Sequence, residues 1–151
     1  MQKTAFSISL FTSFFMTGII WFIQIVQYPS FLQIDSANFS LFHQFHVNHI
    51  TLIVAPIMIL EIIFTLILAV YQVGSTERIL AATAFILIFI IFLSTFFIQV
   101  PIHNQLSVGG KNNNLIHELI NSNWIRTGLW TLKSFLLLYL FSRQKKHTVN
   151  I

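Results

Sequence analysis

Four long apolar runs constrain this chain more than any other feature of its sequence. Roughly 20 consecutive apolar residues span the hydrocarbon core of a bilayer as a helix, and a helix satisfies its own backbone hydrogen bonds in lipid. The sequence therefore predicts an all-α fold, a bundle of four transmembrane helices in one domain with the lipid bilayer as its partner. The predicted helices cover about 5–27, 38–72, 79–100 and 115–141, the domain is 1–141, and a basic tail follows at 142–151.

The low charge of the chain agrees with lipid as its solvent. Only 8% of its 151 residues are charged and 56% are hydrophobic, whereas a soluble domain averages about 25% charged residues. The chain has no cysteine, which excludes disulfides, thiolate metal ligands and haem attached through a thioether. Its net charge is only +4, and no basic stripe carries interleaved aromatics, so nucleic acid is excluded as a partner.

Prolines and small polar residues mark the predicted helix boundaries. Pro29 and Pro101 are expected to end the first and third helices, because proline disfavours helical backbone at the residue before it. Pro56 is expected to bend the second helix, since it removes one backbone hydrogen bond. Ser36 is the predicted N-cap of the second helix. No internal repeat is evident.

The cations predict the orientation of the bundle. If both termini lie inside, one face holds five cations and the other only Lys111. The positive-inside rule therefore predicts cytoplasmic N- and C-termini. The inner set is Lys3, Arg78, Arg143, Lys145 and Lys146.

Polar side chains gather at the opposite, outer ends of the four predicted helices. Five of the six histidines fall there, beside amides and one arginine. Polar and ionisable groups next to hydrocarbon are costly and by default indicate a functional site. The outer set is Gln24, Gln27, His43, His46, His49, Gln99, His103, Asn104, His117, Glu118, Asn121, Asn123 and Arg126.

Two interpretations of these histidines stay open from residue types alone. A histidine at the interface can simply lie half in water, while a converging group could hold a transition metal or haem, as facing helices of bundles do. Side chains three apart on a helix share a face, so His46 and His49 are expected to point into one space. The predicted metal-binding or polar centre is His46, His49, His103 and His117.

The remaining polar residues suggest catalytic and structural roles. Asn123 and Arg126 would stabilise negative charge on a substrate oxygen. Glu118 or a histidine would move protons. Gln24 and Gln27 are more typical of hydrogen bonds between helices.

Glu61 stands alone inside the second apolar run. A carboxylate at that depth has few structural uses and is a functional candidate. It lies 18 residues beyond His43, roughly 27 Å along a helix axis, so these two side chains cannot share one site. Glu61 is expected to be neutral, or to bond to Lys133 or to Thr and Gln groups on neighbouring helices.

Two short segments carry a resemblance to a known family. Val100-Pro101-Ile102-His103-Asn104-Gln105-Leu106 and Asn123-Trp124-Ile125-Arg126-Thr127 resemble the anthrone oxygenase-like family of small four-helix membrane proteins. The family pattern is Val-Pro-x-Asn-x-x-Leu followed by Asn-x-x-Arg-Thr, and His103 stands here in place of the first asparagine. The resemblance implies a four-helix membrane bundle, and for the named members oxygenation of a polycyclic aromatic phenol at the carbon between two rings.

Three functions follow as hypotheses for an integral protein of a bacterial inner membrane. The first is an oxidoreductase or oxygenase acting on an apolar aromatic or quinone-like molecule from the outer leaflet. The second is a haem- or metal-binding electron carrier that uses two of the same histidines. The third is an accessory subunit or small transporter dependent on Glu61. The cofactor, a transition metal or haem if any, and oligomerisation stay open.

Overall fold

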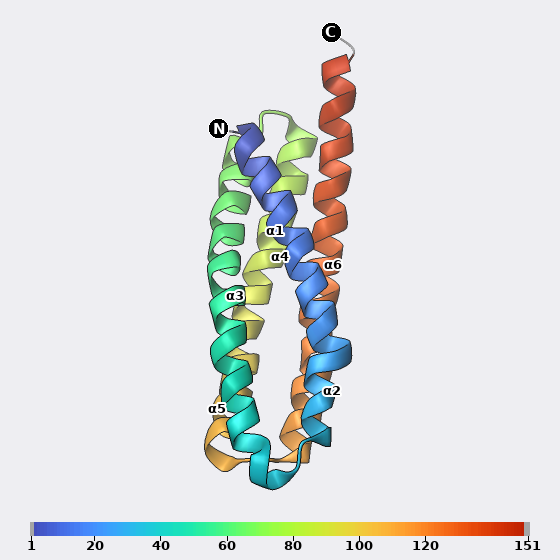
Figure 1. The fold of residues 1–151 in the computed structure, drawn as a ribbon. Helices are drawn as coiled ribbons and strands as arrows, with labels where there is room; N and C mark the ends of the chain where they lie inside the picture. Colours follow the sequence, from blue (N-terminus) through green and yellow to red (C-terminus); the bar gives the residue numbers. More distant parts are fainter. Residues whose placement is uncertain (1, 150–151) are drawn as a thin grey trace.

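The computed structural model describes residues 2–149, with side chains for residues 4–143, and this part of the chain is helical without any strand. Four long rods form a bundle (Figure 1). The elements are α1 (Gln2–Phe22), a π-helical turn (Ile23–Gln27), α2 (Tyr28–Ser30), a 3₁₀ turn (Phe31–Gln33), α3 (Ser36–Tyr71), α4 (Ser75–Ser94), a second π-helical turn (Thr95–Gln99), α5 (Val100–Gly109) and α6 (Asn113–Val149).

The rods form a closed ring around one core. Each packs along two neighbours, in the order α1, α3, α4, α6 and back to α1. The start of α1 and the end of α6 lie at the same end of the bundle as the turn between α3 and α4 (Figure 1). The α2–α3 and α5–α6 connections lie at the opposite end, which is the end that carries the histidines of α3 and α5.

Pro29 and Pro101 do not end their helices, so this prediction was wrong. Helical backbone continues through them, as Thr4–Gln33 and Ser75–Gly109. A π-helical turn precedes each proline, and its wider hydrogen bonds join Tyr28 N–H to Ile23 O and Val100 N–H to Thr95 O. Proline lacks an N–H and clashes with the carbonyl four residues before it; the extra residue of a π-bulge relieves that conflict. The first and third rods thus share a π-helical turn before a proline, which was not predicted from the sequence.

Three of the rods are long and apolar enough to cross a membrane, which indicates a membrane protein. They are Thr4–Gln33, Ser36–Tyr71 and Ser75–Gly109. The fourth rod, α6, is more polar on average because polar residues make up much of both its ends. Asn123, Arg126 and Lys133 lie in its middle part and are buried inside the bundle. The second rod keeps Pro56 inside a continuous helix.

The predicted tail is helical as far as the structure describes it. Residues 142–149 extend α6, whereas 150–151 lie outside the described residues. At the other end of the bundle, Asp35 rather than Ser36 caps α3, and its Oδ1 accepts the Asn38 backbone N–H at 2.9 Å. The hydrogen bonds from Asn38 hold the pKa of the exposed Asp35 carboxyl below its ordinary value.

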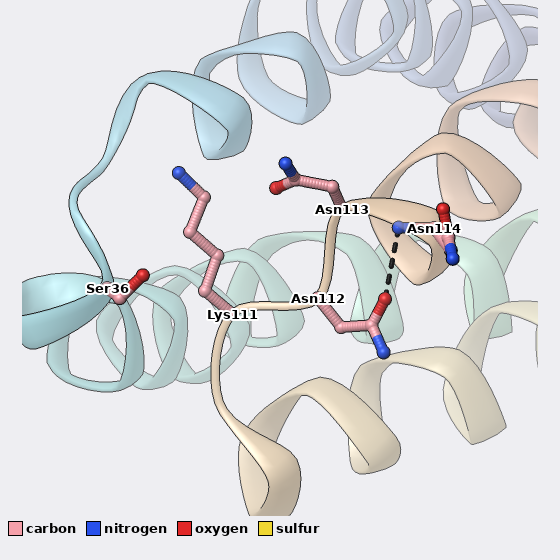
Figure 2. Close-up of a pocket in the computed structure, with 5 residues that line it drawn as sticks. All are labelled: Ser36, Lys111, Asn112, Asn113 and Asn114. Atoms are coloured by element: carbon pink, nitrogen blue, oxygen red, sulfur yellow. Dashed lines mark hydrogen bonds between the residues drawn. The ribbon is translucent and has the colours of Figure 1, made fainter.

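Lys111 ties together the two connections at the histidine end. Its Nζ donates to the carbonyl oxygens of Leu32 at 3.0 Å and Ile34 at 2.7 Å. The next residue, Asn112, caps α6, because its Oδ1 accepts the backbone N–H of Asn114 at 3.0 Å (Figure 2). These bonds fix the α5–α6 connection against the α2–α3 connection and so close the bundle next to the histidines.

Candidate functional site

A cavity of about 240 Å³ lies in the histidine half of the bundle. Apolar side chains form most of its wall, and polar side chains gather at one part of it. Its lining residues are Ile23, Tyr28, His46, Ile50, Thr51, Val54, Ala55, Met58, Ile59, Phe92, Thr95, Phe96, Gln99, Val100, His103 and Arg126.

The cavity reaches the outside of the bundle between α3 and the α4–α5 rod. Four of its lining residues are exposed: Thr51 and Ile59 on α3, and Phe96 and Val100 on the facing rod. Exposed residues around them on both rods, such as Leu52 and Phe97, are large and apolar. A mouth of this composition is compatible with contact with a lipid bilayer.

Arg126 forms the charged part of the cavity wall. Only 5% of this residue is exposed, and its Nη1 donates to Asn123 Oδ1 at 3.1 Å. Its guanidinium lies over the Trp130 ring, 5.2 Å from the ring centre, a favourable cation–π arrangement. Its Nε has no hydrogen-bond partner. A buried cationic donor without a partner is costly, so this N–H is available to a ligand.

Gln99 contributes a second unpartnered polar atom. Its Nε2 donates to Ser122 Oγ at 2.9 Å, while its buried Oε1 accepts no hydrogen bond. The cavity therefore presents one charged donor and one carbonyl acceptor whose hydrogen bonds are unmade within the protein.

A buried amide pair holds Arg126 in place from behind. Asn123 Nδ2 donates to Gln24 Oε1 at 2.9 Å, and Gln24 Nε2 donates to the Ile120 carbonyl at 3.1 Å. This confirms the expected hydrogen bonding of Gln24 between helices. Thr127 also donates to the Asn123 carbonyl at 3.0 Å. The orientation of Asn123, and through it that of Arg126, is thus fixed by α6 together with the π-helical turn that follows α1.

Three of the histidines converge beside Tyr28. Tyr28 Oη lies 3.1 Å from His103 Nε2, and His103 Nδ1 lies 3.0 Å from His43 Nε2. The ring centres of His46 and His103 are 5.9 Å apart. Tyr28, His46, His103 and Arg126 all line the cavity, so two of these histidines face the same space as the charged wall.

The four histidines predicted as a metal centre are not brought together. His46 and His103 line the cavity, whereas His49 is exposed, stacks on Phe45 and bonds to the Phe45 carbonyl. His117 is exposed at the start of α6. Among the described residues, no group of three or more His, Cys, Asp or Glu side chains is placed to hold a metal ion.

Helix geometry explains why His49 leaves the group. A step of three residues rotates the side chain about 60° short of a full turn. Two such steps carry His49 about 120° away from His43, which faces the bundle. Glu118, predicted to move protons, is likewise exposed, and Gln27 is half-buried without lining the cavity.

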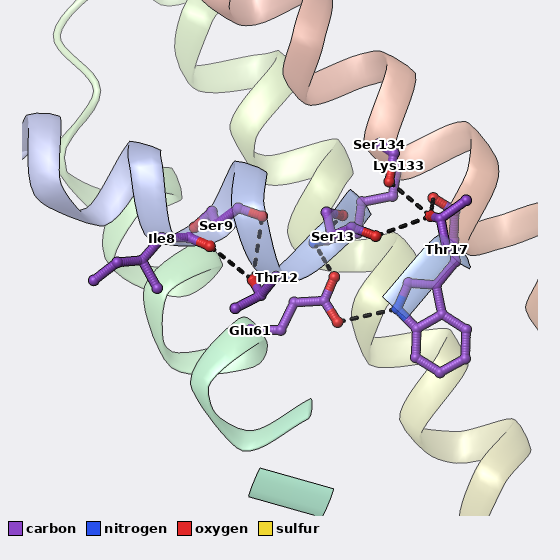
Figure 3. A network of polar contacts seen from close by, with 9 residues as sticks. Ile8, Ser9, Thr12, Ser13, Thr17, Glu61, Lys133 and Ser134 are labelled. Carbon is purple, nitrogen blue, oxygen red and sulfur yellow. Dashed lines mark hydrogen bonds and ion pairs between the residues drawn. The ribbon is translucent and has the colours of Figure 1, made fainter. Parts of the chain in front are cut away.

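Glu61 belongs to a second polar cluster, toward the end of the bundle that holds the chain termini. Its Oε1 pairs with Lys133 Nζ at 2.8 Å, as expected, and its Oε2 accepts from Trp130 Nε1 at 3.0 Å. Lys133 also donates to Ser13 Oγ at 3.0 Å (Figure 3). Trp130 therefore connects the two clusters, because its indole N–H contacts Glu61 and its ring contacts Arg126.

Residue-type reasoning missed Tyr28, Trp130 and Ser107 as members of these networks. Tyrosine and tryptophan near a membrane boundary are usually interfacial. Their register was the available signal: in the first rod, Tyr28 follows buried Gln24 by four residues, and Trp130 follows buried Arg126 by four on α6.

Comparisons with protein-family models, curated proteins and solved structures give no match to this chain.

Proposed function

We propose that this protein is a four-span membrane oxidoreductase that binds an apolar aromatic molecule with a weakly acidic oxygen, such as a phenol or quinone-like compound, taken from the outer leaflet. The observation that carries the proposal is the lipid-facing cavity in which Arg126 Nε and Gln99 Oε1 lack partners. Ligand sites are typically apolar clefts with a few convergent polar groups that fix orientation.

The outward face of α6 supports its role as a fourth span. Between Trp124 and Tyr139 its charged residues, Arg126 and Lys133, are buried, whereas its exposed large side chains are apolar or aromatic. These are Trp124, Ile125, Leu132, Phe135, Leu138 and Tyr139. Polar residues inside and apolar residues outside are what lipid requires of a helix in a bundle. With the excess of cations at the terminal end, the termini are then cytoplasmic.

The wall composition matches a flat apolar molecule with one polar edge. Ile50, Val54, Met58 and Phe92 surround the space that rings would occupy. Arg126 would donate to an anionic oxygen, and the Gln99 carbonyl would accept from a hydroxyl. A fixed cationic donor in a low-dielectric site stabilises developing oxyanion charge strongly.

The resemblance to the anthrone oxygenase-like family supplies the reaction. In such an oxidation the base removes one proton from the carbon between two rings, and dioxygen adds to the resulting carbanion. The peroxide then loses hydroxide as the second C–H bond breaks, which leaves a ketone, and hydroxide regains a proton to form water. In this chain His46, or His103 acting through the Tyr28 hydroxyl, would be the base, and Arg126 would hold the enolate oxygen.

Binding and oxygen uptake in lipid nanodiscs test this function. The probe is 2-naphthol, whose fluorescence reports binding, and the substrate is anthrone. Arg126→Gln is expected to weaken naphthol binding about ten- to a hundredfold, because a charge-assisted hydrogen bond contributes about 1.5–3 kcal/mol. Arg143→Gln, at the far end of α6, is the matched control and should bind as the wild type.

Anthrone oxidation should consume one dioxygen for each anthraquinone formed. Absence of naphthol binding by the folded wild-type protein, or equal binding by Arg126→Gln, would refute the proposed site. A Soret band in the purified protein would favour the haem-binding electron carrier instead.

A further inference from the structure

Four side chains form a continuous hydrogen-bonded row from the cavity to the surface. Tyr28 Oη and His103 Nε2 are 3.1 Å apart, His103 Nδ1 and His43 Nε2 are 3.0 Å apart, and His43 Nδ1 and Ser107 Oγ are 3.2 Å apart. Tyr28 and His103 line the cavity. Ser107 is exposed near the end of α5, at the histidine end of the bundle.

His43 has no evident use other than as a link in this row. It is fully buried and does not line the cavity. Phe39 stacks on its ring with 5.5 Å between centres, and Phe31 meets it edge-on at 5.4 Å. Apolar packing of this kind keeps water from the imidazole, so a proton on His43 can pass only to His103 or Ser107.

The number of hydrogens in the row restricts it to two neutral arrangements. A neutral imidazole carries one N–H and one acceptor nitrogen. If Tyr28 donates to His103, then His103 donates from Nδ1 to His43, and His43 donates from Nδ1 to Ser107. If Ser107 donates to His43, both rings instead carry hydrogen on Nε2, and His103 donates to Tyr28. The two rings therefore always share the same tautomer.

We propose that Tyr28, His103, His43 and Ser107 form a proton relay between the cavity and the outer aqueous face. The relay rests on the proposed function, since it serves a substrate that ionises in the cavity. When the ligand loses a proton to Tyr28 Oη, the Tyr28 proton moves to His103, the His103 Nδ1 proton to His43, the His43 Nδ1 proton to Ser107, and the Ser107 proton to water. Within the relay only O–H and N–H bonds change, and the bond broken in the substrate is the C–H or O–H bond that ionises.

The proposed oxidation also resets the relay. Ionisation of the substrate sends one proton outward, and hydroxide departure takes one proton back to form water. The return shift restores the first pair of tautomers, so no buried ring needs to flip. The cationic Arg126 and the imidazole of His46 are the other ionisable groups that face His103.

The first test needs no ligand. Nitrogen-15 spectra of histidine-labelled wild-type protein in nanodiscs should show a coupling across the hydrogen bond between His43 Nε2 and His103 Nδ1. The shifts should also assign one shared tautomer, or one shared exchange between tautomers, to both rings. Different fixed tautomers on the two rings, or absence of the coupling, would overturn the relay.

The second test uses 2-naphthol as a photoacid bound in the cavity. Its naphtholate emission reports proton loss within the excited-state lifetime. His43→Phe, which keeps a ring between Phe31 and Phe39, should retain naphthol affinity and lower the naphtholate emission about tenfold. His49→Phe, on the exposed face of the same helix, is the control and should leave both quantities unchanged.

The outcomes separate the relay from the proposed function. Unchanged naphtholate emission in His43→Phe, with unchanged affinity, would overturn the relay and leave the site standing. Failure of the wild type to bind naphthol would refute the proposed function, and the nitrogen spectra would then decide on the relay alone. If His43→Phe does not fold, the nitrogen spectra of the wild-type protein test the relay in its place.

Discussion

Glu61 on α3 and Lys133 on α6 form an ion pair with 2.8 Å between Oε1 and Nζ, and neither side chain is exposed. Trp130 and Ser13 supply further hydrogen bonds to this pair. A buried pair is costly to desolvate, and its attraction offsets that cost only when the remaining donors and acceptors are satisfied. Trp130 and Ser13 satisfy most of the remaining donors and acceptors of this pair, so the pair is expected to stabilise the packing of α1, α3 and α6.

Removing one partner should therefore destabilise the bundle more than removing both. Glu61→Gln is expected to lower the free energy of unfolding by about 3–5 kcal/mol, because it leaves the Lys133 ammonium buried and unpaired. The double variant Glu61→Gln/Lys133→Met should recover most of that loss. Denaturant unfolding in detergent micelles measures both changes.

The partly exposed pair of Arg143 and Glu77, at 3.1 Å, provides the control. Arg143→Gln should cost less than about 1 kcal/mol, since exposed pairs contribute little. If Glu61→Gln unfolds like the wild type but removes activity, the carboxylate is functional rather than structural, as the transporter hypothesis requires.

Filling the cavity should remove binding without removing the fold. Ala55 lines the cavity from α3 and is partly buried, so Ala55→Phe places a ring in the space available to a ligand. The expected result is a loss of 2-naphthol affinity of at least about tenfold with little change in unfolding. Leu66→Phe is the matched control, because Leu66 lies on the same helix, does not line the cavity and is 44% exposed. Equal naphthol affinity in both variants would place the ligand elsewhere.

The cap of α3 should depend on pH. Hydrogen bonds from Asn38 lower the pKa of the Asp35 carboxyl from its ordinary value of 3.8, so the folded state favours the ionised form. The stabilisation of α3 by the ionised Asp35 carboxyl is therefore present at neutral pH and is lost as the pH falls through the lowered pKa. The protection factor of the Asn38 amide against hydrogen exchange should fall over that range. Asp35→Asn retains a capping side chain and should remove this pH dependence.

Single cysteines can test the orientation, because the natural chain has none. Val73, in the turn between α3 and α4, and Val108, near the end of α5, are 86% and 92% exposed. In sealed right-side-out vesicles, an impermeant maleimide should label Val108→Cys and should leave Val73→Cys unlabelled until the membrane is opened. The reverse pattern would invert the proposed topology.

The sequence predicted the helical class and the four rods because apolar runs of span length leave few alternatives. It placed two boundaries wrongly at Pro29 and Pro101, since the usual rule assumes that the helix keeps its ordinary hydrogen bonding. The π-helical turns before both prolines change that bonding, and no single residue type announces them. The matching Gln-x-Pro segments at these two places were the overlooked signal.

The candidate site was predictable only in part. Arg126, Asn123, His46 and His103 lie where facing helix ends would put them. Residue spacing could not decide which imidazoles turn inward, because the azimuth of α3 depends on its packing against α1 and α4. The structure consequently adds buried His43 to the histidines of the candidate site. It removes His49 and His117, which are exposed.

The position of the cavity mouth between Thr51 and Val100 on the apolar flank determines how affinity should be expressed. A molecule that enters from this side is first distributed between water and membrane, so its occupancy follows its mole fraction among the lipids. Titrations at two lipid-to-protein ratios should then give different apparent constants in aqueous units and one constant in membrane units. Among compounds that fit the cavity equally well, the apparent affinity in aqueous units should increase with the oil–water partition coefficient.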